Sequence, residues 1–295
     1  MTAREEGFLL LTCPLGDPDR KALTVAQFRE LTKRAAAMEK PLEDRDLTEE
    51  DLVNLGCNRT FAKRVLHLFS QRDQLAWYLE KCYQKQCYPI TRLSPQYPGK
   101  IRQTLGLEAP GSLWAKGDSS CLDKPMIGLV GSRDLHSENR AFAESVGRQA
   151  ALQGFTLVSG NARGADRTAQ DACLEAGGSV ISIVADELYN KPASDRILYL
   201  SEDGFDLAFS SIRALSRNRL IHSLPSKVFV AQCTLGKGGT WQGSMKNLQN
   251  NYNSVFCFAD GSDAMEELSQ MGARLIAIEE LFDLESLDHN NITLF

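Results

Sequence analysis

The strongest constraint on this chain is a series of short apolar segments that alternate with helix-forming stretches from residue 126 onward. The segments are short and largely apolar, and the stretch between the first two places Phe142, Val146 and Ala150 at helical spacing. Continuous apolar strands that alternate with helices are typical of a parallel sheet covered on both faces. We therefore predict an α/β fold with a doubly wound, mostly parallel sheet. The predicted strands are 126–130, 155–159, 180–185, 197–200, 228–232, 255–258 and 275–278.

The beginning of the chain shows a different pattern, which predicts a small N-terminal helical domain. Thr48 and Asp51 have the spacing of a capping box, in which a hydroxyl and a later carboxylate close the start of a helix. Gly56 then interrupts the helical pattern and predicts a helix–turn–helix. The next segment holds five of the ten prolines, which oppose helix interiors and central strands. The predicted divisions are a helical domain at 1–88, a connector at 89–125 and a sheet domain at 126–295.

The charge of the chain is unevenly distributed. The net charge is −5, so there is no global basic signature for nucleic acid. Residues 207–250 nevertheless contain six lysines or arginines and no aspartate or glutamate, whereas residues 260–289 contain nine acidic residues and one arginine. Any binding of nucleic acid is therefore predicted to come from a local patch.

The cysteine and histidine patterns exclude several classes of protein. None of the eight cysteines stands in a Cys-x-x-Cys pair, and the four histidines form no ligand pattern, so we expect no metal and no cofactor. No secretory signal opens the chain, and no apolar run approaches the roughly 18 residues of a membrane span. The sequence predicts a cytoplasmic protein with reduced thiols and no membrane partner.

Two predicted loops at the carboxyl ends of strands have the composition of a phosphate cradle. The first is Gly131-Ser132-Arg133, and the second is Ser159-Gly160-Asn161-Ala162-Arg163-Gly164-Ala165-Asp166. Glycine lets the backbone approach a ligand, helix N-terminal amides favour an anion, and arginine offers a charged fork. Either loop alone is also consistent with a plain strand-to-helix turn that carries a surface arginine. Asp166 either holds Arg163 or caps the following helix.

Two further segments lie in the acid-free stretch. Arg217-Asn218-Arg219 is predicted at a helix start, where two arginines suit several phosphate oxygens. The glycine-rich loop 236–240 matches neither the Walker A spacing nor Gly-x-Gly-x-x-Gly. Trp241 follows it and either stacks on a base or packs in the core. The candidate ligand groups of this loop are Lys237, Gly239 and Thr240.

In this order, the segments 131–133, 159–166 and 217–221 resemble the DNA-processing protein A family (DprA/Smf). The likeness extends to 201–202 and 272–275, and upstream to 87–90 and 113–118, so that it covers most of residues 8–287. It implies an extended Rossmann-like domain with a helix–hairpin–helix or SAM-like domain before it. It also implies a protein that holds single-stranded DNA by its phosphates without catalysis, forms a homodimer and hands DNA to the RecA recombinase.

The resemblance assigns the candidate residues to walls of one phosphate pocket. The first wall is Gly131, Ser132 and Arg133. The second is Ser159, Gly160, Arg163 and Gly164, and the third is Arg217, Asn218 and Arg219.

The chain also departs from the family pattern, and two alternatives stay open. Gly238-Gly239-Thr240-Trp241 replaces the usual Ser-Gly-Ser-Leu, and we expect a divergent member without the C-terminal winged helix. The first alternative is a sensor of a nucleotide-derived signal, which would use the same phosphate cradle. The second is a nucleoside-monophosphate phosphoribohydrolase of the LOG type. It is disfavoured because Trp241, Gln242 and Gly243 stand where the catalytic carboxylate is needed.

Overall fold

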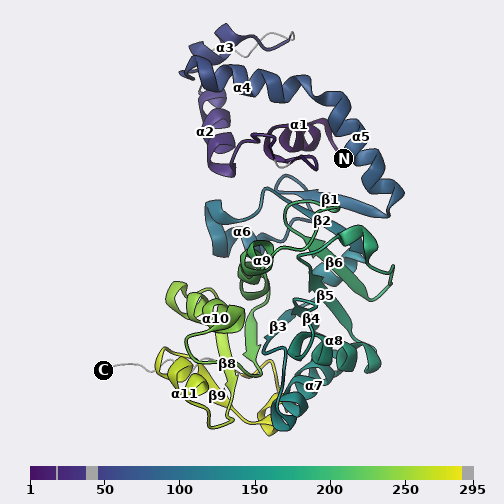
Figure 1. The fold of residues 1–295 in the computed structure, drawn as a ribbon, viewed down its shortest axis with the longest axis vertical. Helices are drawn as coiled ribbons and strands as arrows, with labels where there is room; N and C mark the ends of the chain where they lie inside the picture. Colours follow the sequence, from purple (N-terminus) through teal and green to yellow (C-terminus); the bar gives the residue numbers. More distant parts are fainter. Residues whose placement is uncertain (18, 38–45, 288–295) are drawn as a thin grey trace.

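One mixed β-sheet forms the centre of the protein in the computed structural model, which describes residues 1–17, 19–37 and 46–287 (Figure 1). Its strands within these ranges are β1 Cys87–Thr91, β2 Ser112–Gly117, β3 Met126–Val130, β4 Thr156–Ser159, β5 Ser179–Ile183, β6 Ile197–Ser201, β7 Lys227–Val230, β8 Ser254–Phe258 and β9 Arg274–Ile276. The spatial order is β1-β2-β6-β5-β4-β3-β7-β8-β9. All pairs from β6 to β9 are parallel, which confirms the predicted α/β class and the seven predicted strands.

The order of the strands places a topological switch point between β3 and β7. From β3 the chain adds β4, β5 and β6 toward one edge, then returns to pair β7 with β3 and adds β8 and β9 toward the other edge. In open parallel sheets, ligands bind beyond the carboxyl ends of the strands at such a point. The loops that follow β3 and β7 are therefore the ones best placed to form a site.

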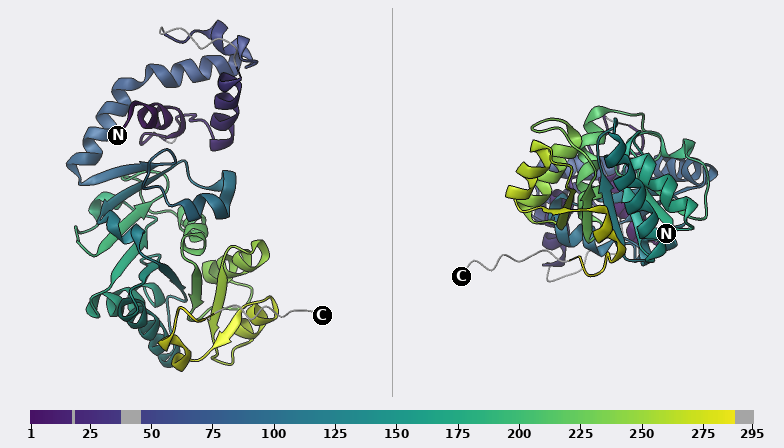
Figure 2. Two further views of the ribbon diagram at one scale, coloured as in Figure 1. Left: turned by 180° about the vertical axis from the view of Figure 1, so that it is seen from behind. Right: turned by 90° about the horizontal axis from the view of Figure 1, so that it is seen from below.

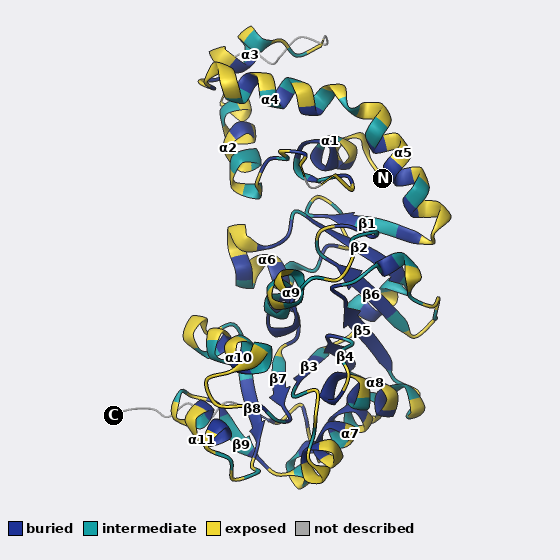
Figure 3. Cartoon of the chain, in the orientation of Figure 1, coloured by how far each residue is buried: buried dark blue, intermediate teal, exposed yellow. Residues whose placement is uncertain are grey.

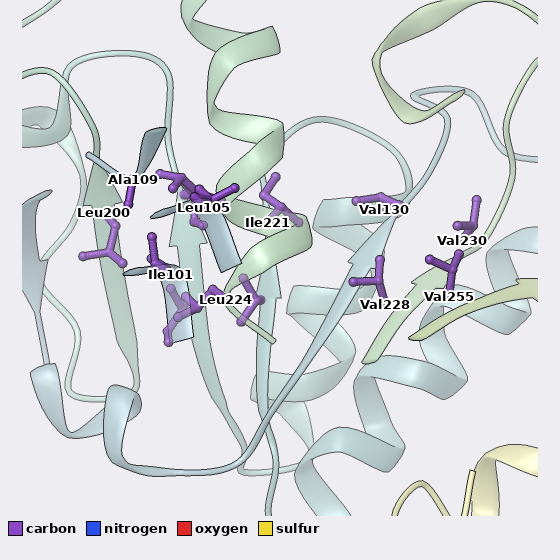
Figure 4. Packing of buried hydrophobic residues seen from close by; sticks show 14 of the residues in the cluster. Ile101, Leu105, Ala109, Val130, Leu200, Ile221, Leu224, Val228, Val230 and Val255 are labelled. Carbon is purple, nitrogen blue, oxygen red and sulfur yellow. The ribbon is translucent and has the colours of Figure 1, made fainter. Parts of the chain in front are cut away.

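Helices cover both faces of the sheet, as Figure 1 shows. The helices of the sheet region are α6 Gly99–Leu105, α7 Ser137–Leu152, α8 Ala165–Glu175, α9 Ser211–Ser223, α10 Gly238–Asn250 and α11 Asp263–Gln270. Side chains of α7 and α8, such as Phe142 and Ala169, pack with Phe229 on one face. Side chains of α6, α9 and α11 pack on the other face, and Figure 4 shows Ile221 of α9 and Leu224, which directly follows α9, in that cluster with Val228. Burial on both faces explains why the strands are continuously apolar, and Figure 3 shows them buried.

A group of helices from the N-terminal part of the chain lies at one end of the long axis (Figures 1 and 2). They are α1 Ala3–Thr12, α2 Val25–Ala36, α3 Glu49–Asn54, α4 Arg59–Ser70 and α5 Arg72–Gln84. The predicted capping box is present: Thr48 accepts from the backbone N–H of Asp51, and Asp51 accepts from that of Thr48. Gly56 adopts φ +80° in the turn between α3 and α4. No helix in the described ranges is both long and apolar enough to cross a bilayer.

The proline-rich segment 89–125 contributes to the sheet itself. It supplies β2 and most of β1, which pair antiparallel with each other, and β2 pairs antiparallel with β6. Pro89 is tolerated because β1 is the edge strand, where a missing N–H need not break a ladder. The helical region docks at this edge of the sheet: the Tyr78 hydroxyl and the Lys81 ammonium of α5 both donate to Asp206 in the loop after β6, at 2.9 and 2.7 Å.

Candidate nucleic-acid interface

A pocket of about 460 Å³ lies at the carboxyl ends of β3 and β7, at the switch point of the sheet. We call it the switch pocket. Its walls are the loop after β3, the start of α8, one side of α9 and the start of α10. Eight of the candidate residues line it: Gly131, Ser132, Arg133, Arg217, Asn218, Lys237, Gly239 and Thr240.

The loop after β3 is held close to the start of α8. A Cβ on Gly131 would lie 2.4 Å from the Cβ of Ala165, so only glycine allows this approach. The Ser132 carbonyl accepts from the Ala165 N–H at 3.1 Å, and the Ser132 N–H donates to the Gln232 carbonyl at 2.9 Å. Arg133 is exposed, and its guanidinium has no hydrogen-bond or ion-pair partner among the described residues. It is therefore free to contact an anion in the pocket.

Arg217 provides a second positive charge, and this one is buried. Its side chain reaches across to β5, where Nη1 donates to the Ile183 carbonyl at 2.9 Å. Its Nε has no partner in the described part of the chain. Burial lowers the pKa of Arg217, while the nearby Asp166 carboxylate opposes that shift. A buried guanidinium with an unused donor is well suited to a phosphate oxygen.

Asp166 braces the loop after β4 in a way that neither sequence alternative describes. Its Oδ2 accepts from the backbone N–H of Ala162 at 3.1 Å. Burial raises the pKa of this carboxyl, and Arg217 counteracts that effect. Arg163 pairs instead with Asp134 at 2.7 Å, where both side chains are exposed to solvent. Asp166 therefore holds the backbone of its own loop beside the pocket, rather than Arg163.

The start of α10 closes the pocket on the side of β7. Thr240 Oγ1 donates to the Gly131 carbonyl at 3.0 Å, which ties the helix to the first loop. The Asn218 side-chain N–H donates to the Gly239 carbonyl at 3.2 Å, which ties α9 to α10. Lys237 is the N-cap residue of this 13-residue helix and is exposed. A helix N-terminus beside a lysine attracts anions because its backbone N–H groups are unsatisfied.

Five candidate residues do not line the switch pocket. Ser159 is fully buried, and its hydroxyl accepts from Gln170 at 2.5 Å. Gly160 lies behind Arg217, and Gly164 lies beneath the first loop, where it adopts φ +86°. Arg163 faces solvent outside the pocket. The structure thus brings the second loop close to the site as a support.

Arg219 is the fifth of these residues, and it lies on the far side of α9 from the pocket. It pairs with Glu202 and donates to the Glu108 carbonyl. The expectation of a helix start at 217–219 is wrong, because α9 begins at Ser211. Residues two apart on a helix differ by about 200° in direction, so Arg217 and Arg219 cannot face one pocket.

Sequence reasoning missed Phe209 and His222, which both line the switch pocket. Phe209 is 57% exposed at the pocket, although nothing but its place in the acid-free stretch distinguishes it in the sequence. Trp241, by contrast, is 7% exposed and belongs to the apolar core, which confirms its packing alternative. His222 is buried in the contact between α9 and α10 and also lines the pocket.

The protonation of His222 follows from its neighbours. Asn247 Oδ1 accepts from the Asn253 N–H at 3.0 Å, so the amide nitrogen of Asn247 must face the histidine. Nδ1 of His222 then accepts at 3.1 Å, and the proton resides on Nε2. Burial lowers the pKa of His222 to about 4, so the ring is neutral at pH 7. The described residues contain no cluster of three or more histidine, cysteine or acidic side chains that could hold a metal ion.

Comparisons with known proteins identify the family. The family described as DNA recombination-mediator protein A matches residues 89–283. The DNA processing protein DprA of Streptococcus pneumoniae is 29% identical over 247 residues, which is 79% of this chain and 85% of that protein. Protein Smf of Escherichia coli is 28% identical over 158 residues, or 48% of this chain and 40% of Smf.

Solved structures show the same fold. The crystal structure of S. pneumoniae DprA superposes with a TM-score of 0.71 and 24% identity, covering 96% of this chain and 99% of that one. DNA processing protein A of Helicobacter pylori, described for its single-stranded DNA binding mode, gives a TM-score of 0.56 and 23% identity, with 67% and 94% covered. The family match spans about two thirds of the chain, from β1 to the segment after β9. The chain therefore belongs to the DNA recombination-mediator protein A (DprA/Smf) family.

Proposed function

We propose that this protein binds single-stranded DNA and holds its phosphates in the switch pocket, acting in DNA processing without catalysing a reaction. The observation that carries the proposal is the gathering of Arg133, Arg217 and Lys237 around one pocket that also receives the N-terminus of α10. The pocket lies where parallel sheets bind ligands. The names of the S. pneumoniae and H. pylori relatives support the same ligand class.

The pocket suits a phosphate better than it suits chemistry on a substrate. Of its three cationic side chains, Arg133 and Lys237 lie at the surface, and Arg217 lies beneath them with Nε unpaired. Its acidic lining residue is Asp166, whose Oδ2 already accepts from the Ala162 N–H. Phe209, exposed at the same pocket, offers a flat apolar surface to a base.

The test is fluorescence anisotropy of a labelled oligothymidylate across a salt series. Wild-type protein is expected to bind, with a log–log slope of about −0.7 per phosphate contact. Arg133→Gln with Lys237→Gln is expected to weaken binding and to flatten the slope, and both residues are exposed, so folding is retained. The matched control is Arg72→Gln with Arg148→Gln, which removes the same charge from two exposed sites outside the pocket. Absence of binding at low salt contradicts the proposal.

A second candidate is a sensor of a mononucleotide, favoured by the size of the pocket. About 460 Å³ lies within the range of roughly 300–1,000 Å³ typical of small-molecule sites. A ligand that binds only the folded state raises its thermal stability in proportion to the logarithm of ligand concentration. Stabilisation by mononucleotides but not by oligonucleotides would establish this candidate. Release of free adenine from AMP would instead establish the phosphoribohydrolase alternative.

The assembly and cellular place of the protein are further parts of the proposal. We include a homodimer and delivery of DNA to RecA, which the family resemblance implies, and cytoplasmic localisation. The eight free cysteines support the last point, because oxidising compartments favour disulfides. Light scattering tests the dimer, and co-sedimentation with RecA on single-stranded DNA tests the handover.

A further inference from the structure

Four arginines line a second groove directly beside the switch pocket. The groove, of about 460 Å³, lies between the loop after β3 and the N-terminal parts of α7 and α8. Its arginines are Arg133, Arg140, Arg163 and Arg167, and we call it the arginine groove. We infer that a DNA strand held in the switch pocket continues into this groove, where the four arginines bind the adjoining phosphates. This inference rests on the proposed function.

Most of the positive charge in the groove is not neutralised. Arg133 and Arg167 have no side-chain hydrogen bond or ion pair with any residue in the described ranges. Arg140 donates only to the neutral hydroxyl of Thr168, at 3.2 Å. Guanidinium groups held near one another repel, and binding an anion between them relieves that repulsion.

The one ion pair in the groove is easily exchanged. Arg163 and Asp134 lie 2.7 Å apart, but their side chains are 76% and 84% exposed. Exposed pairs of this kind contribute only about 0–1 kcal/mol, so a phosphate can replace the carboxylate. Asp171 is the other acidic residue that lines the groove. Four arginines against two carboxylates leave an excess of positive charge in a chain whose net charge is −5.

The groove is formed before any ligand binds, because α7 and α8 touch closely. A Cβ on Gly147 of α7 would lie 2.1 Å from the Ala169 carbonyl of α8, so the helices meet backbone to backbone. The bond between Arg140 and Thr168 spans the same pair of helices. A rigid helix pair fixes the backbone positions of these arginines, so binding has to order only their side chains.

The groove is also continuous with the switch pocket. Arg133 lines both, so a strand that contacts it can extend from one to the other. A pocket on the opposite side of α9 adjoins the switch pocket too, but its lining includes Glu108, and its Arg219 already pairs with Glu202. The charges therefore direct the strand along α7 and α8.

The experiment compares two double variants with the same change in charge. Arg140→Gln with Arg167→Gln removes two groove arginines that do not line the switch pocket. Arg72→Gln with Arg148→Gln is the control, at exposed sites outside both. Binding of a long oligothymidylate and of a thymidine trinucleotide is measured across a salt series. Thermal unfolding of each variant verifies that it is folded.

The groove variant is expected to bind the long oligonucleotide about tenfold more weakly, as two exposed phosphate contacts are lost. Its salt slope should be shallower by about 1.4, from about 0.7 per contact. The trinucleotide should bind it as it binds wild type, and the control variant should match wild type with both ligands. Arg167→Glu alone, at a side chain with no partner to lose, should weaken long-strand binding further than Arg167→Gln.

The experiment distinguishes a failure of the arginine-groove proposal from a failure of the proposed function. If the groove variant binds the long oligonucleotide with the affinity and salt slope of wild type, the arginine-groove proposal is wrong. The proposed role of the switch pocket is not affected by that result. Equal weakening by the control variant also overturns it, because the effect would then be one of net charge. Absence of any binding by wild type overturns the proposed function and the groove together.

Discussion

The guanidinium of Arg217 occupies the space that a side chain at Gly160 would fill: a Cβ there would lie 1.5 Å from Nη1. The loop after β4 therefore serves the switch pocket by leaving room for a buried arginine. The same arginine donates to the Ile183 carbonyl, so it is held from β5 as well. A glycine outside the lining of the switch pocket thus determines where a buried charge of that pocket lies.

We expect Gly160→Ala to weaken binding of single-stranded DNA nearly as much as Arg217→Ala does. The added methyl group must displace the guanidinium, because the two cannot share the site. The double variant should bind no more weakly than Arg217→Ala, since the two changes act through one side chain. Anisotropy titrations of the four proteins check this. Gly99→Ala, where a Cβ meets nothing within 4 Å, is the control. Additive losses would show that Gly160 acts independently of Arg217.

Gly164→Ala should destabilise the protein by about 3 kcal/mol. Gly164 has φ +86°, and a Cβ would lie 2.4 Å from the carbonyl oxygens of Ser132 and Arg133. Gly177→Ala is the control that separates backbone strain from steric crowding, because Gly177 has φ +83° but a Cβ there would meet nothing within 4 Å. That control should cost about 1 kcal/mol. Urea unfolding measures both, and equal losses would rule out the close contact as the cause.

Stability should fall between pH 7 and pH 5 because of His222. Its pKa is about 4 in the folded protein and about 6.5 when unfolded, so the unfolded state takes up the proton first. The contribution of the neutral His222 ring to the free energy of unfolding is fully present above pH ~6.5 and is lost as pH falls toward 4. From pH 7 to pH 5 the loss should be about 2 kcal/mol. Urea unfolding of wild type and His222→Gln at both pH values checks this, and equal pH dependence would contradict it.

The thiols of the folded protein should react slowly with Ellman's reagent. All eight cysteines are free and buried, and burial raises the pKa of Cys13, Cys173 and Cys233 to about 12. Reaction requires the thiolate and access to solvent. In urea all eight should react rapidly. Rapid reaction of one thiol in the native protein would indicate an accessible site, and Cys233 is the one at the switch pocket.

The order of elements and the place of the site were predictable from the chain because both depend on local patterns. Continuous apolar strands followed by helices require a sheet covered on both faces, and parallel strands bring their following loops to one edge. Gly131-Ser132-Arg133 and 236–240 follow β3 and β7, the two strands at the switch point. The acid-free stretch 207–250 supplies much of the lining of the same pocket.

The direction of each side chain depended on the tertiary structure. Arg217 and Arg219 look equivalent in the sequence, but the phase of α9 turns one into the pocket and the other toward Glu202. Arg163 lies in a predicted phosphate loop, yet it faces solvent outside the switch pocket, where it pairs with Asp134, 29 positions earlier. Partners so distant in the chain meet only when the helices pack, so no local pattern reports them.

The proline-rich segment and the arginine groove also show the difference between what local sequence patterns predict and what tertiary packing decides. Prolines in 89–125 favour a connector, yet the segment supplies β2, which pairs with β1 on one side and with the distant β6 on the other. The groove likewise joins Arg140 of α7 to Arg167 of α8, which the sequence places in separate helices. The sequence alone determines which elements form and in what order, because hydrophobic periodicity and turn chemistry act over a few residues. Only the packed structure decides which charges share a surface, because that depends on helix phase and on contacts between segments far apart in the chain.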